Sequence, residues 1–409
     1  MNLLTNSSFN KFLNVLLRVS GMGSKFLLFT ILSKYFTNLT YGNYSLITSI
    51  ITIMIFVLGI DFYNYGIRDI LNTRNKDEIK NKLFSSFVLY IFTYSIFLLI
   101  GFFIFNELSY TKEYVFIIIF LCIAEHFSQE VYRVLVAFNK VLFANILLFI
   151  RTTIWSTYII LLVYRNVELG ISFILKLWLI SDLITIVIPF FYFLKIKDIL
   201  SMKFIPSWIK KGIKVSLIFF TGTVFLKLIE YANRFIVDAF LGREIVGVYT
   251  FYSSIAILIT VYINTIVISF ELPNILKAKK TDLERALFSK LKKSLLTQTL
   301  LISIVLLIII HPILMWQNKH VYKEYLPILY FMIAGVGLMN YSLHYHFKLY
   351  AKHYDTELLK TIVVSGVISL TISIVLTYKF GVYGASSAFV ISGGVLYINR
   401  FIAVKKLNI

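Results

Sequence analysis

The chain is short of cysteine and of charged residues. Cys122 is the only cysteine among its 409 residues, which excludes an internal disulfide and a cysteine-rich metal or iron–sulfur site. Charged residues make up 15% of the chain, whereas an average soluble domain has about 25%. A water-soluble fold of this length would therefore lack the polar surface to cover itself. The sequence predicts a protein that is surrounded by lipid.

Apolar residues are abundant instead, at 59% of the chain, and the mean hydropathy is +0.83. A membrane-spanning helix needs about 20 mostly apolar residues. Twelve stretches meet this requirement: 11–36, 44–63, 83–105, 114–138, 141–164, 169–194, 213–231, 245–270, 295–315, 326–350, 358–378 and 382–404. The predicted fold class is an all-α polytopic membrane protein with about twelve transmembrane helices.

Acidic residues are also few, so that 40 Lys and Arg face 20 Asp and Glu and the net charge is +20. The basic residues lie in short loops between apolar runs, not on one face as in a nucleic-acid-binding protein, and we expect no nucleic-acid partner. When the loops are assigned to alternate sides, 27 Lys and Arg fall on one side and eight on the other. The positive-inside rule makes the first side cytoplasmic and places both termini there.

The two halves of the chain share a short motif. Tyr41-Gly-Asn-Tyr44 follows the first predicted helix, and Val246-Gly-Val-Tyr249 follows the seventh, with an offset of 205 residues. Six helices return the chain to the same side, so the halves would be parallel repeats related by an axis along the membrane normal. We predict an N-terminal six-helix bundle over 1–200, a cytoplasmic connector over 201–214 and a C-terminal six-helix bundle over 215–409.

Several segments resemble one known group of transporters. They are the Tyr41–Tyr44 motif, Arg18 inside the first helix, Asp61 followed by Arg68, the segment Ala232–Tyr249 and the segment Phe380–Ser386. In this order and within a six-plus-six topology, the chain resembles the O-antigen flippases, often called Wzx. These form the polysaccharide transporter branch of the multidrug/oligosaccharidyl-lipid/polysaccharide flippase superfamily. Asn233 stands where an acidic residue is expected before Arg234, which departs from the pattern.

The resemblance implies two six-helix bundles in a V around a central cavity that opens alternately to each side. It implies a flippase for an undecaprenyl-diphosphate-linked oligosaccharide such as an O-antigen repeat unit, moved from the cytoplasmic to the periplasmic face of the bacterial inner membrane. It further implies a monomer surrounded by membrane lipids, with the polymerase and chain-length regulator of the same lipopolysaccharide pathway as partners. No cofactor, no catalytic residue and no ATPase activity are expected.

Basic residues inside predicted helices are the first candidate site, because an ionisable group at mid-bilayer is costly and needs a reason. Arg18 and Lys25 are seven residues apart, two turns along one helix face, with small residues between them. Arg151 lies near the middle of the fifth helix. We predict that these three cations bind the substrate diphosphate. The alternatives are that Arg18 extends to the interface, that Lys25 pairs with an acid and that Arg151 pairs with an acid such as Asp182.

Acidic residues in the fourth and sixth helices are the second candidate site. Glu125, His126, Glu130 and Asp182 could couple transport to an ion gradient, since a buried carboxylate beside a histidine can exchange a proton or cation. The alternative is a helix lock in which Glu130 pairs with Arg133. Nothing in the sequence decides between the two.

Four charges at the outer end of the seventh helix form a third group. Lys227, Glu230, Arg234 and Asp238 follow one another at spacings of three, four and four. These are partner spacings on a helix, so the set is interpreted as a periplasmic gate latch or as an ion-pair ladder. His344 and His346 are too close in sequence to face the same way, and we predict no metal site.

Two other functions fit a polytopic membrane protein. A membrane-embedded polysaccharide polymerase or ligase would need a sizeable outer loop for its reactive groups, and every outer connection here is short. A drug or metabolite cation antiporter of the same superfamily would be expected to show fewer cavity cations and a clearer acidic site. The sequence also lacks the phosphate-binding loop of a nucleotide-driven pump. The flippase is therefore the leading hypothesis, and the protein is predicted to be a transporter, not an enzyme.

Overall fold

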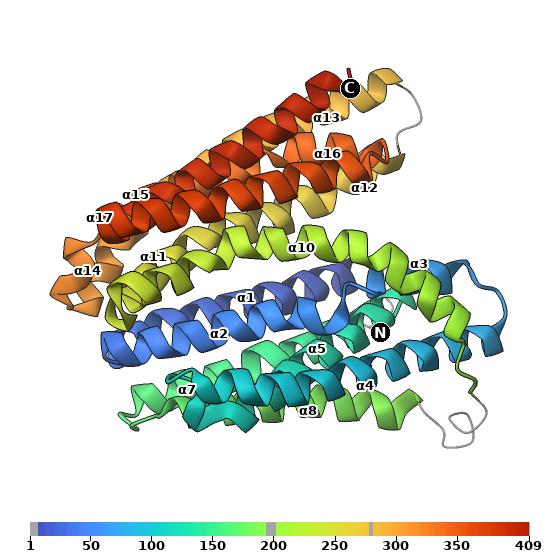
Figure 1. Cartoon of the computed structure of the whole chain (residues 1–409), viewed down its shortest axis with the longest axis horizontal. Helices are drawn as coiled ribbons and strands as arrows, with labels where there is room; N and C mark the ends of the chain where they lie inside the picture. The colour runs from blue at the N-terminus through green and yellow to red at the C-terminus, as the bar shows by residue number, and fades with distance from the viewer. Residues whose placement is uncertain (1–6, 194–201, 278–280, 409) are drawn as a thin grey trace. The chain divides into compact units, whose positions relative to one another are not determined.

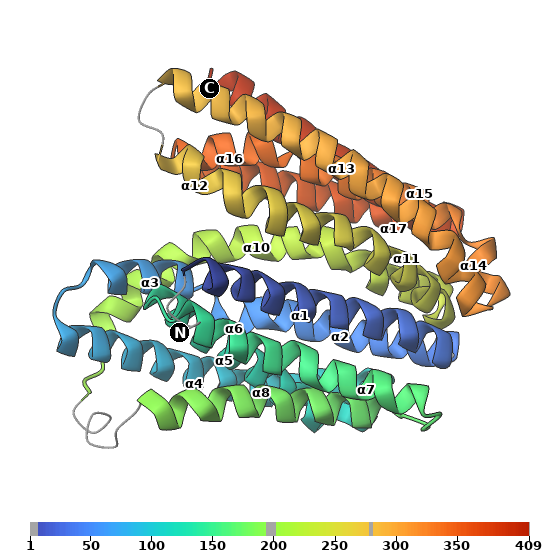
Figure 2. The same ribbon diagram turned by 180° about the vertical axis from the view of Figure 1, so that it is seen from behind.

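The computed structural model describes residues 7–193, 202–277 and 281–408, and within these ranges the chain forms helices and no strand (Figure 1). The N-terminal half contains α1 (Ser7–Tyr35), α2 (Asn38–Gly59), α3 (Tyr63–Asn72), α4 (Lys76–Glu107), η2 (Lys112–Tyr114), α5 (Val115–Ala137), α6 (Val141–Phe149), η3 (Ile150–Ile154), α7 (Trp155–Tyr164) and α8 (Ile171–Phe193). The C-terminal half contains α10 (Pro206–Leu241), α11 (Arg243–Tyr262), η4 (Ile263–Ile268), α12 (Ser269–Lys277), α13 (Thr281–Gln317), α14 (His320–Glu324), α15 (Pro327–Tyr341), α16 (Leu343–Ala351) and α17 (Asp355–Lys406). Figure 2 shows α6, η3 and α7 as one continuous rod.

Each of the twelve predicted apolar runs corresponds to helical structure. Ten helices in the described ranges are long and apolar enough to cross a membrane. The last of them, α17, contains two of the predicted runs, which meet at a kink where Gly381 has φ +59°, a conformation that favours glycine. The run 326–350 is divided into α15 and α16 at Ser342. The predicted fold class, an all-α polytopic membrane protein, is confirmed.

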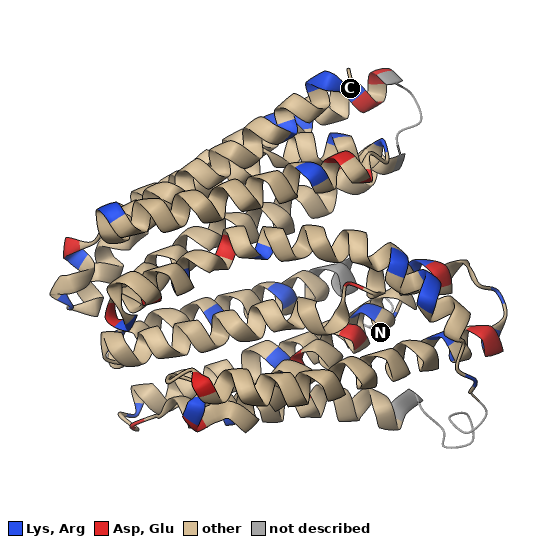
Figure 3. Cartoon of the chain, viewed as in Figure 1, with Lys and Arg blue, Asp and Glu red and all other residues tan. Residues whose placement is uncertain are grey.

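Large apolar side chains on the outside of the helices face the lipid. Leu99, Phe103 and Phe191 are 68%, 69% and 80% exposed, which water would penalise and hydrocarbon does not. Most charged residues lie toward the ends of the helices (Figure 3). The described helices thus have the surface expected for a chain embedded in a bilayer.

The chain divides into two compact units. Unit 1 comprises 1–31 and 47–224, and unit 2 comprises 32–46 and 225–409. These boundaries differ from the predicted ones, since 32–46 groups with the second unit and α10 is divided at Val224. Residues 206–214 of the predicted connector are the first turns of α10, and 194–201 lie outside the described residues. The arrangement as two repeated bundles stays a prediction.

Hydrogen bonds explain why the segment 32–46 groups with unit 2. The Gln317 side chain donates to Ser33 Oγ at 2.6 Å, and Lys319 Nζ donates to the carbonyl oxygens of Ser33 and Phe36 at 2.8 and 2.5 Å. Tyr322 OH donates to the same Ser33 carbonyl at 3.3 Å. Lys319 and Tyr322 thus satisfy carbonyl groups at the end of α1, where an α-helix leaves its last carbonyls without intrahelical partners.

The glycines of the repeated motif contact each other's helices within unit 2. A Cβ on Gly42 would lie 2.0 Å from the Arg243 carbonyl oxygen, and a Cβ on Gly247 would lie 2.6 Å from the Asn38 carbonyl oxygen. Gly42 and Gly247 are 205 residues apart, and so are Asn38 and Arg243. The contact is therefore reciprocal, as it is across a two-fold interface. The sequence offset of the repeat is matched by a symmetric contact in space.

We expect Gly42→Ala and Gly247→Ala each to destabilise the protein by about 1–3 kcal/mol, because the new methyl group meets backbone that cannot move aside. The apparent Tm of the purified protein in detergent measures this effect. Gly337→Ala is the control, since its Cβ would meet only a Thr299 methyl group at an ordinary 3.7 Å. Unchanged Tm values for both test variants would contradict the close contact.

An ionic cluster joins α3, α4 and α10 in unit 1. Asp69 Oδ2 accepts from Lys82 Nζ at 2.6 Å and from Trp208 Nε1 at 2.8 Å, and Lys82 also contacts Glu78 at 2.8 Å. Burial acts to raise the pKa of the Asp69 carboxyl, but the hydrogen bonds from Lys82 and Trp208 outweigh it and hold this pKa below its usual value. Ionised Asp69 therefore stabilises the attachment of α3.

Acid is expected to remove this stabilisation. The pKa of Asp69 is lower in the folded chain than its unfolded value of about 3.9, so its contribution is complete above that pH and is lost as the pH falls through the folded-state value. The apparent Tm of the wild type should fall more steeply than that of Asp69→Asn between pH 5 and the onset of acid unfolding. Glu168→Gln, at an exposed position, should follow the wild type. Parallel curves for wild type and Asp69→Asn would refute the assignment.

Candidate functional site

Two buried carboxyl groups and two cations meet inside unit 1. Lys25 comes from α1, Glu125 from α5, Arg151 from η3 and Asp182 from α8; we call them the four-charge cluster. Glu125 and Asp182 are 3% and 0% exposed, and Arg151 is 9% exposed. The carboxyl groups of Glu125 and Asp182 interact electrostatically with each other. Two carboxylates so close are stable only when cations compensate them or a proton is shared, and here both cations are supplied by other helices.

The contacts of Glu125 and Arg151 define this cluster. Arg151 Nη2 lies 3.9 Å from Glu125 Oε1, and Arg151 Nη1 donates to Ser128 Oγ at 3.0 Å. Trp178 Nε1 donates to Glu125 Oε2 at 3.2 Å. Arg151 lies in a π-helical turn, a feature that is frequent at functional sites. Arg151 therefore pairs with Glu125. It also interacts electrostatically with Asp182, whose oxygens accept no hydrogen bond among the described residues.

Within the four-charge cluster, Lys25 lies against an aromatic ring. Its Nζ lies 5.1 Å from the centroid of the Trp178 ring, a cation–π distance. Trp178 stacks on Trp155 with ring centroids 5.4 Å apart, and Trp155 Nε1 donates to the Arg151 carbonyl oxygen at 2.7 Å. The Lys25 side chain is half-buried and its helix packs on η3, where Ser24 Oγ donates to the Thr152 carbonyl at 3.4 Å.

Arg18 has a different environment from the other predicted cations. Its Nε donates to Asn145 Oδ1 and its Nη2 to Tyr132 OH, both at 3.1 Å. Asn145 in turn donates to Asn14 at 2.6 Å. Among the residues whose side chains the structure describes, no carboxylate lies within ion-pair distance of Arg18. Its half-buried guanidinium is thus oriented by neutral partners while its charge is not neutralised.

His126 and Glu130 belong to a second buried network, separate from the four-charge cluster. Glu130 accepts from Tyr90 OH at 2.8 Å and from Arg133, whose guanidinium lies 3.6 Å from the centroid of the Tyr63 ring. His126 Nδ1 lies 2.5 Å from Tyr94 OH, and its Nε2 is 3.7 Å from Glu130 Oε1. The pairing of Glu130 with Arg133, which the helix-lock interpretation requires, is present in the structure.

The four charges at the end of α10 pair in part as their spacing predicts. Lys227 Nζ lies 2.6 Å from Glu230 Oε2. Asp238 pairs with Arg243 of α11 at 3.7 Å. Arg234 lies over the Tyr231 ring at 5.1 Å and donates to Ser253 at 3.3 Å. Lys227 and Glu230 thus form a pair within α10, and Asp238 has a cationic partner on the next helix.

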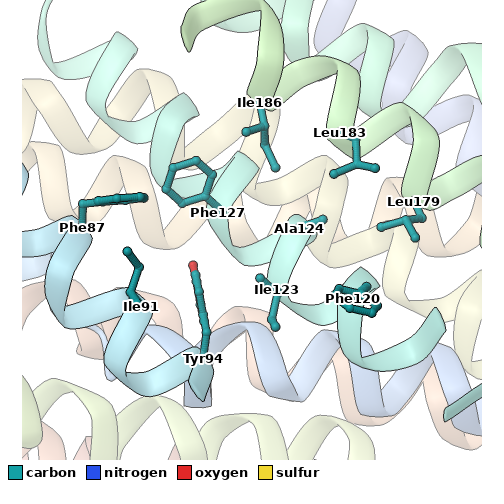
Figure 4. Close-up of a pocket in the computed structure, with 10 residues that line it drawn as sticks. All are labelled: Phe87, Ile91, Tyr94, Phe120, Ile123, Ala124, Phe127, Leu179, Leu183 and Ile186. Atoms are coloured by element: carbon teal, nitrogen blue, oxygen red, sulfur yellow. The ribbon is translucent and has the colours of Figure 1, made fainter. Parts of the chain in front are cut away.

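An apolar cavity of about 290 Å³ lies between α4, α5 and α8 in unit 1 (Figure 4). Apolar side chains form its wall, and Tyr94 is the one lining residue with a hydroxyl group. That hydroxyl contacts His126, so it belongs to the second network rather than to a polar binding site. The cavity is suited to hydrocarbon and adds no chemistry to the charged groups.

Comparisons with known proteins can now be set beside this geometry. No curated protein sequence matches the chain significantly. Among solved structures, the chain is similar to the inward closed conformation of the lipid II flippase MurJ, with a TM-score of 0.74 and 16% identity over 98% of this chain and 88% of that one.

Two multidrug transporters are also similar. An inward-facing MATE family transporter of the MOP superfamily gives a TM-score of 0.70 at 15% identity, covering 98% of this chain and 94% of that one. A MATE transporter of Vibrio cholerae gives 0.65 at 14%, covering 97% and 96%. These likenesses establish a shared transporter fold. The family model described as polysaccharide biosynthesis protein matches residues 9–279, about two thirds of the sequence, and the chain therefore belongs to that family.

Proposed function

We propose that the protein is a flippase that moves an undecaprenyl-diphosphate-linked oligosaccharide, such as an O-antigen repeat unit, from the cytoplasmic to the periplasmic face of the bacterial inner membrane. Membership of a polysaccharide biosynthesis family supports a glycan cargo. The fold shared with a lipid II flippase supports a cargo linked to lipid. A drug or metabolite antiporter is supported by the MATE fold alone.

The observation that best supports this proposal is the environment of Arg18, whose hydrogen-bond partners are neutral. A diphosphate is a compact polyanion, and a guanidinium can hold it with two parallel hydrogen bonds. Arg18 is positioned by Asn145 and Tyr132, which leave its positive charge available. Lys25 lies two turns further along α1 and would add a second positive charge. A cationic drug would be repelled by such a helix face.

The other predicted residues have supporting roles in the proposal. Arg151 is engaged by Glu125 and Ser128, so we assign it to holding the four-charge cluster together with Asp182 rather than to first contact with the diphosphate. Glu130 with Arg133 locks the end of α5, and His126 beside Glu130 remains the place where a proton could couple to transport. The pair Lys227 and Glu230 is assigned to the periplasmic gate.

Deletion of the gene in its native host tests the proposal. We expect loss of surface polysaccharide and accumulation of undecaprenyl-linked repeat units inside the cell, both restored by a plasmid copy of the wild type. A deletion strain that has no second flippase gene and still makes normal surface polysaccharide would refute the proposal. Normal glycan with increased drug sensitivity would support the antiporter instead.

A further inference from the structure

A cavity of about 580 Å³ in unit 2 is lined by basic residues from two helices. Arg285 and Lys292 come from α13, Lys348 comes from α16, and Lys352 directly follows α16; we call this cavity the basic pocket. It lies where the start of α13, the end of α16 and the end of α17 come together, and Asn408 completes the lining (Figure 2). It belongs to a different unit from Arg18 and the four-charge cluster.

The charges of the basic pocket do not balance. Lys352 pairs with Glu284 at 2.8 Å, and Glu284 is the one carboxylate among the described lining residues. Arg285, Lys292 and Lys348 have no carboxylate within ion-pair distance in the described part of the chain. Three positive charges around one cavity repel each other unless an anion lies between them. The basic pocket is therefore built for an anionic group.

Two aromatic residues are part of the lining of the basic pocket. Phe288 is buried at 7% exposure, and Lys348 Nζ lies 6.0 Å from its ring centroid. Tyr345 also lines the cavity and packs on a buried cluster of Leu349, Ala403 and Val404. Cations beside aromatic rings suit an amphiphile better than a freely soluble anion, because the apolar surface gains nothing from water.

The position of the basic pocket also favours a lipid. It lies at the N-terminal end of the membrane-spanning helix α13, on the side that carries the excess of Lys and Arg and that the positive-inside rule makes cytoplasmic. Basic pockets between transmembrane helices at this level of the bilayer bind anionic headgroups. Phospholipids are present there at high local concentration, whereas a soluble anion must arrive from water.

We propose that the basic pocket binds the phosphodiester headgroup of an anionic phospholipid from the adjoining leaflet. Lys292 and Lys348 bind the phosphate, and the glycerol and the start of the acyl chains rest against Phe288 and Tyr345. The site is separate from the substrate site and holds whether or not the protein is a flippase. The bound lipid neutralises the unit 2 cations and stabilises the junction of α13 with α16.

Lipid titration of the purified full-length protein in detergent tests this. We expect phosphatidylglycerol to raise the apparent Tm of the wild type. Native mass spectrometry should show that it binds the double variant Lys292→Gln/Lys348→Gln at least about tenfold more weakly than the wild type, since each cation contributes substantially to headgroup attraction. Phosphatidylcholine should do neither. The control Lys210→Gln/Lys214→Gln removes two exposed cations outside the basic pocket and should bind as the wild type does.

Two further arms make the outcome decisive. Lys292→Arg/Lys348→Arg keeps the charges and should keep phosphatidylglycerol binding, which separates loss of the site from loss of folding. Inorganic phosphate and glycerol 3-phosphate should not raise the Tm at millimolar concentration. The proposal is overturned if these soluble anions raise the Tm as much as phosphatidylglycerol does. It is also overturned if phosphatidylglycerol and phosphatidylcholine bind equally, or if the double glutamine variant binds phosphatidylglycerol as the wild type does. Translocation is not measured, so this result is independent of the proposed function.

Discussion

Replacing Glu125 with glutamine is expected to lower the yield of folded protein strongly and to destabilise the remainder by about 3–5 kcal/mol, the cost of leaving a buried charge without its partner. Glu125 is 3% exposed and faces Arg151, with Lys25 nearby. Without its carboxylate, the buried Arg151 loses its ion-pair partner and Lys25 loses a nearby negative charge. Size-exclusion yield and apparent Tm in detergent measure the effect.

The double variant Glu125→Gln/Arg151→Gln separates charge imbalance from loss of packing. It removes one charge of each sign, so it should recover part of the stability that the single variant loses. Glu113→Gln, at an exposed position outside the cluster, is the control and should be unaffected. A single Glu125→Gln variant as stable as the wild type would show that this carboxyl is not ionised in the folded chain, contrary to the account of the four-charge cluster.

Replacing Arg18 with glutamine is expected to have the opposite profile: normal yield and Tm, with surface polysaccharide reduced at least about tenfold. The structural cost is small because its partners are neutral and keep their own contact, in which Tyr132 OH donates to Asn145 at 3.2 Å. The functional cost is expected to be large because, under the proposed function, a charge-assisted contact to phosphate is lost. Polysaccharide is quantified in the deletion strain carrying each variant.

The matched control is Lys112→Gln, which removes an exposed cation from the predicted outer side and should restore polysaccharide fully. Arg18→Lys should restore part of it, since an ammonium keeps the charge but not the bidentate geometry. Normal polysaccharide with Arg18→Gln at wild-type protein level would remove Arg18 from the substrate site.

The helices could be predicted from the sequence because the bilayer imposes a length and a hydropathy that local residues must meet on their own. The shared motif was visible in the sequence because Gly42 and Gly247 stand 205 residues apart, and both glycines lie at a close helix contact. The break of α17 at Gly381 lies between the predicted runs 358–378 and 382–404.

The partners of the charged residues could not be predicted, because they depend on which helices pack together. The structure pairs Asp238 with Arg243, which lies on α11 and which the spacing along α10 could not indicate. Trp178, which contacts both Glu125 and Lys25, is one of many aromatic residues in the chain and carries no local signal. The neutral partners of Arg18, which distinguish it from Arg151, could not be predicted from the sequence either.

Translocation by the purified protein is the most direct test of the central claim. Proteoliposomes carrying a fluorescent undecaprenyl-diphosphate oligosaccharide are mixed with a membrane-impermeant glycosidase that reaches only the outer leaflet. We predict that wild-type protein makes nearly all of the labelled lipid accessible within minutes, while empty liposomes and Arg18→Gln proteoliposomes leave about half protected. Equal protection in liposomes with and without the wild-type protein would contradict the account.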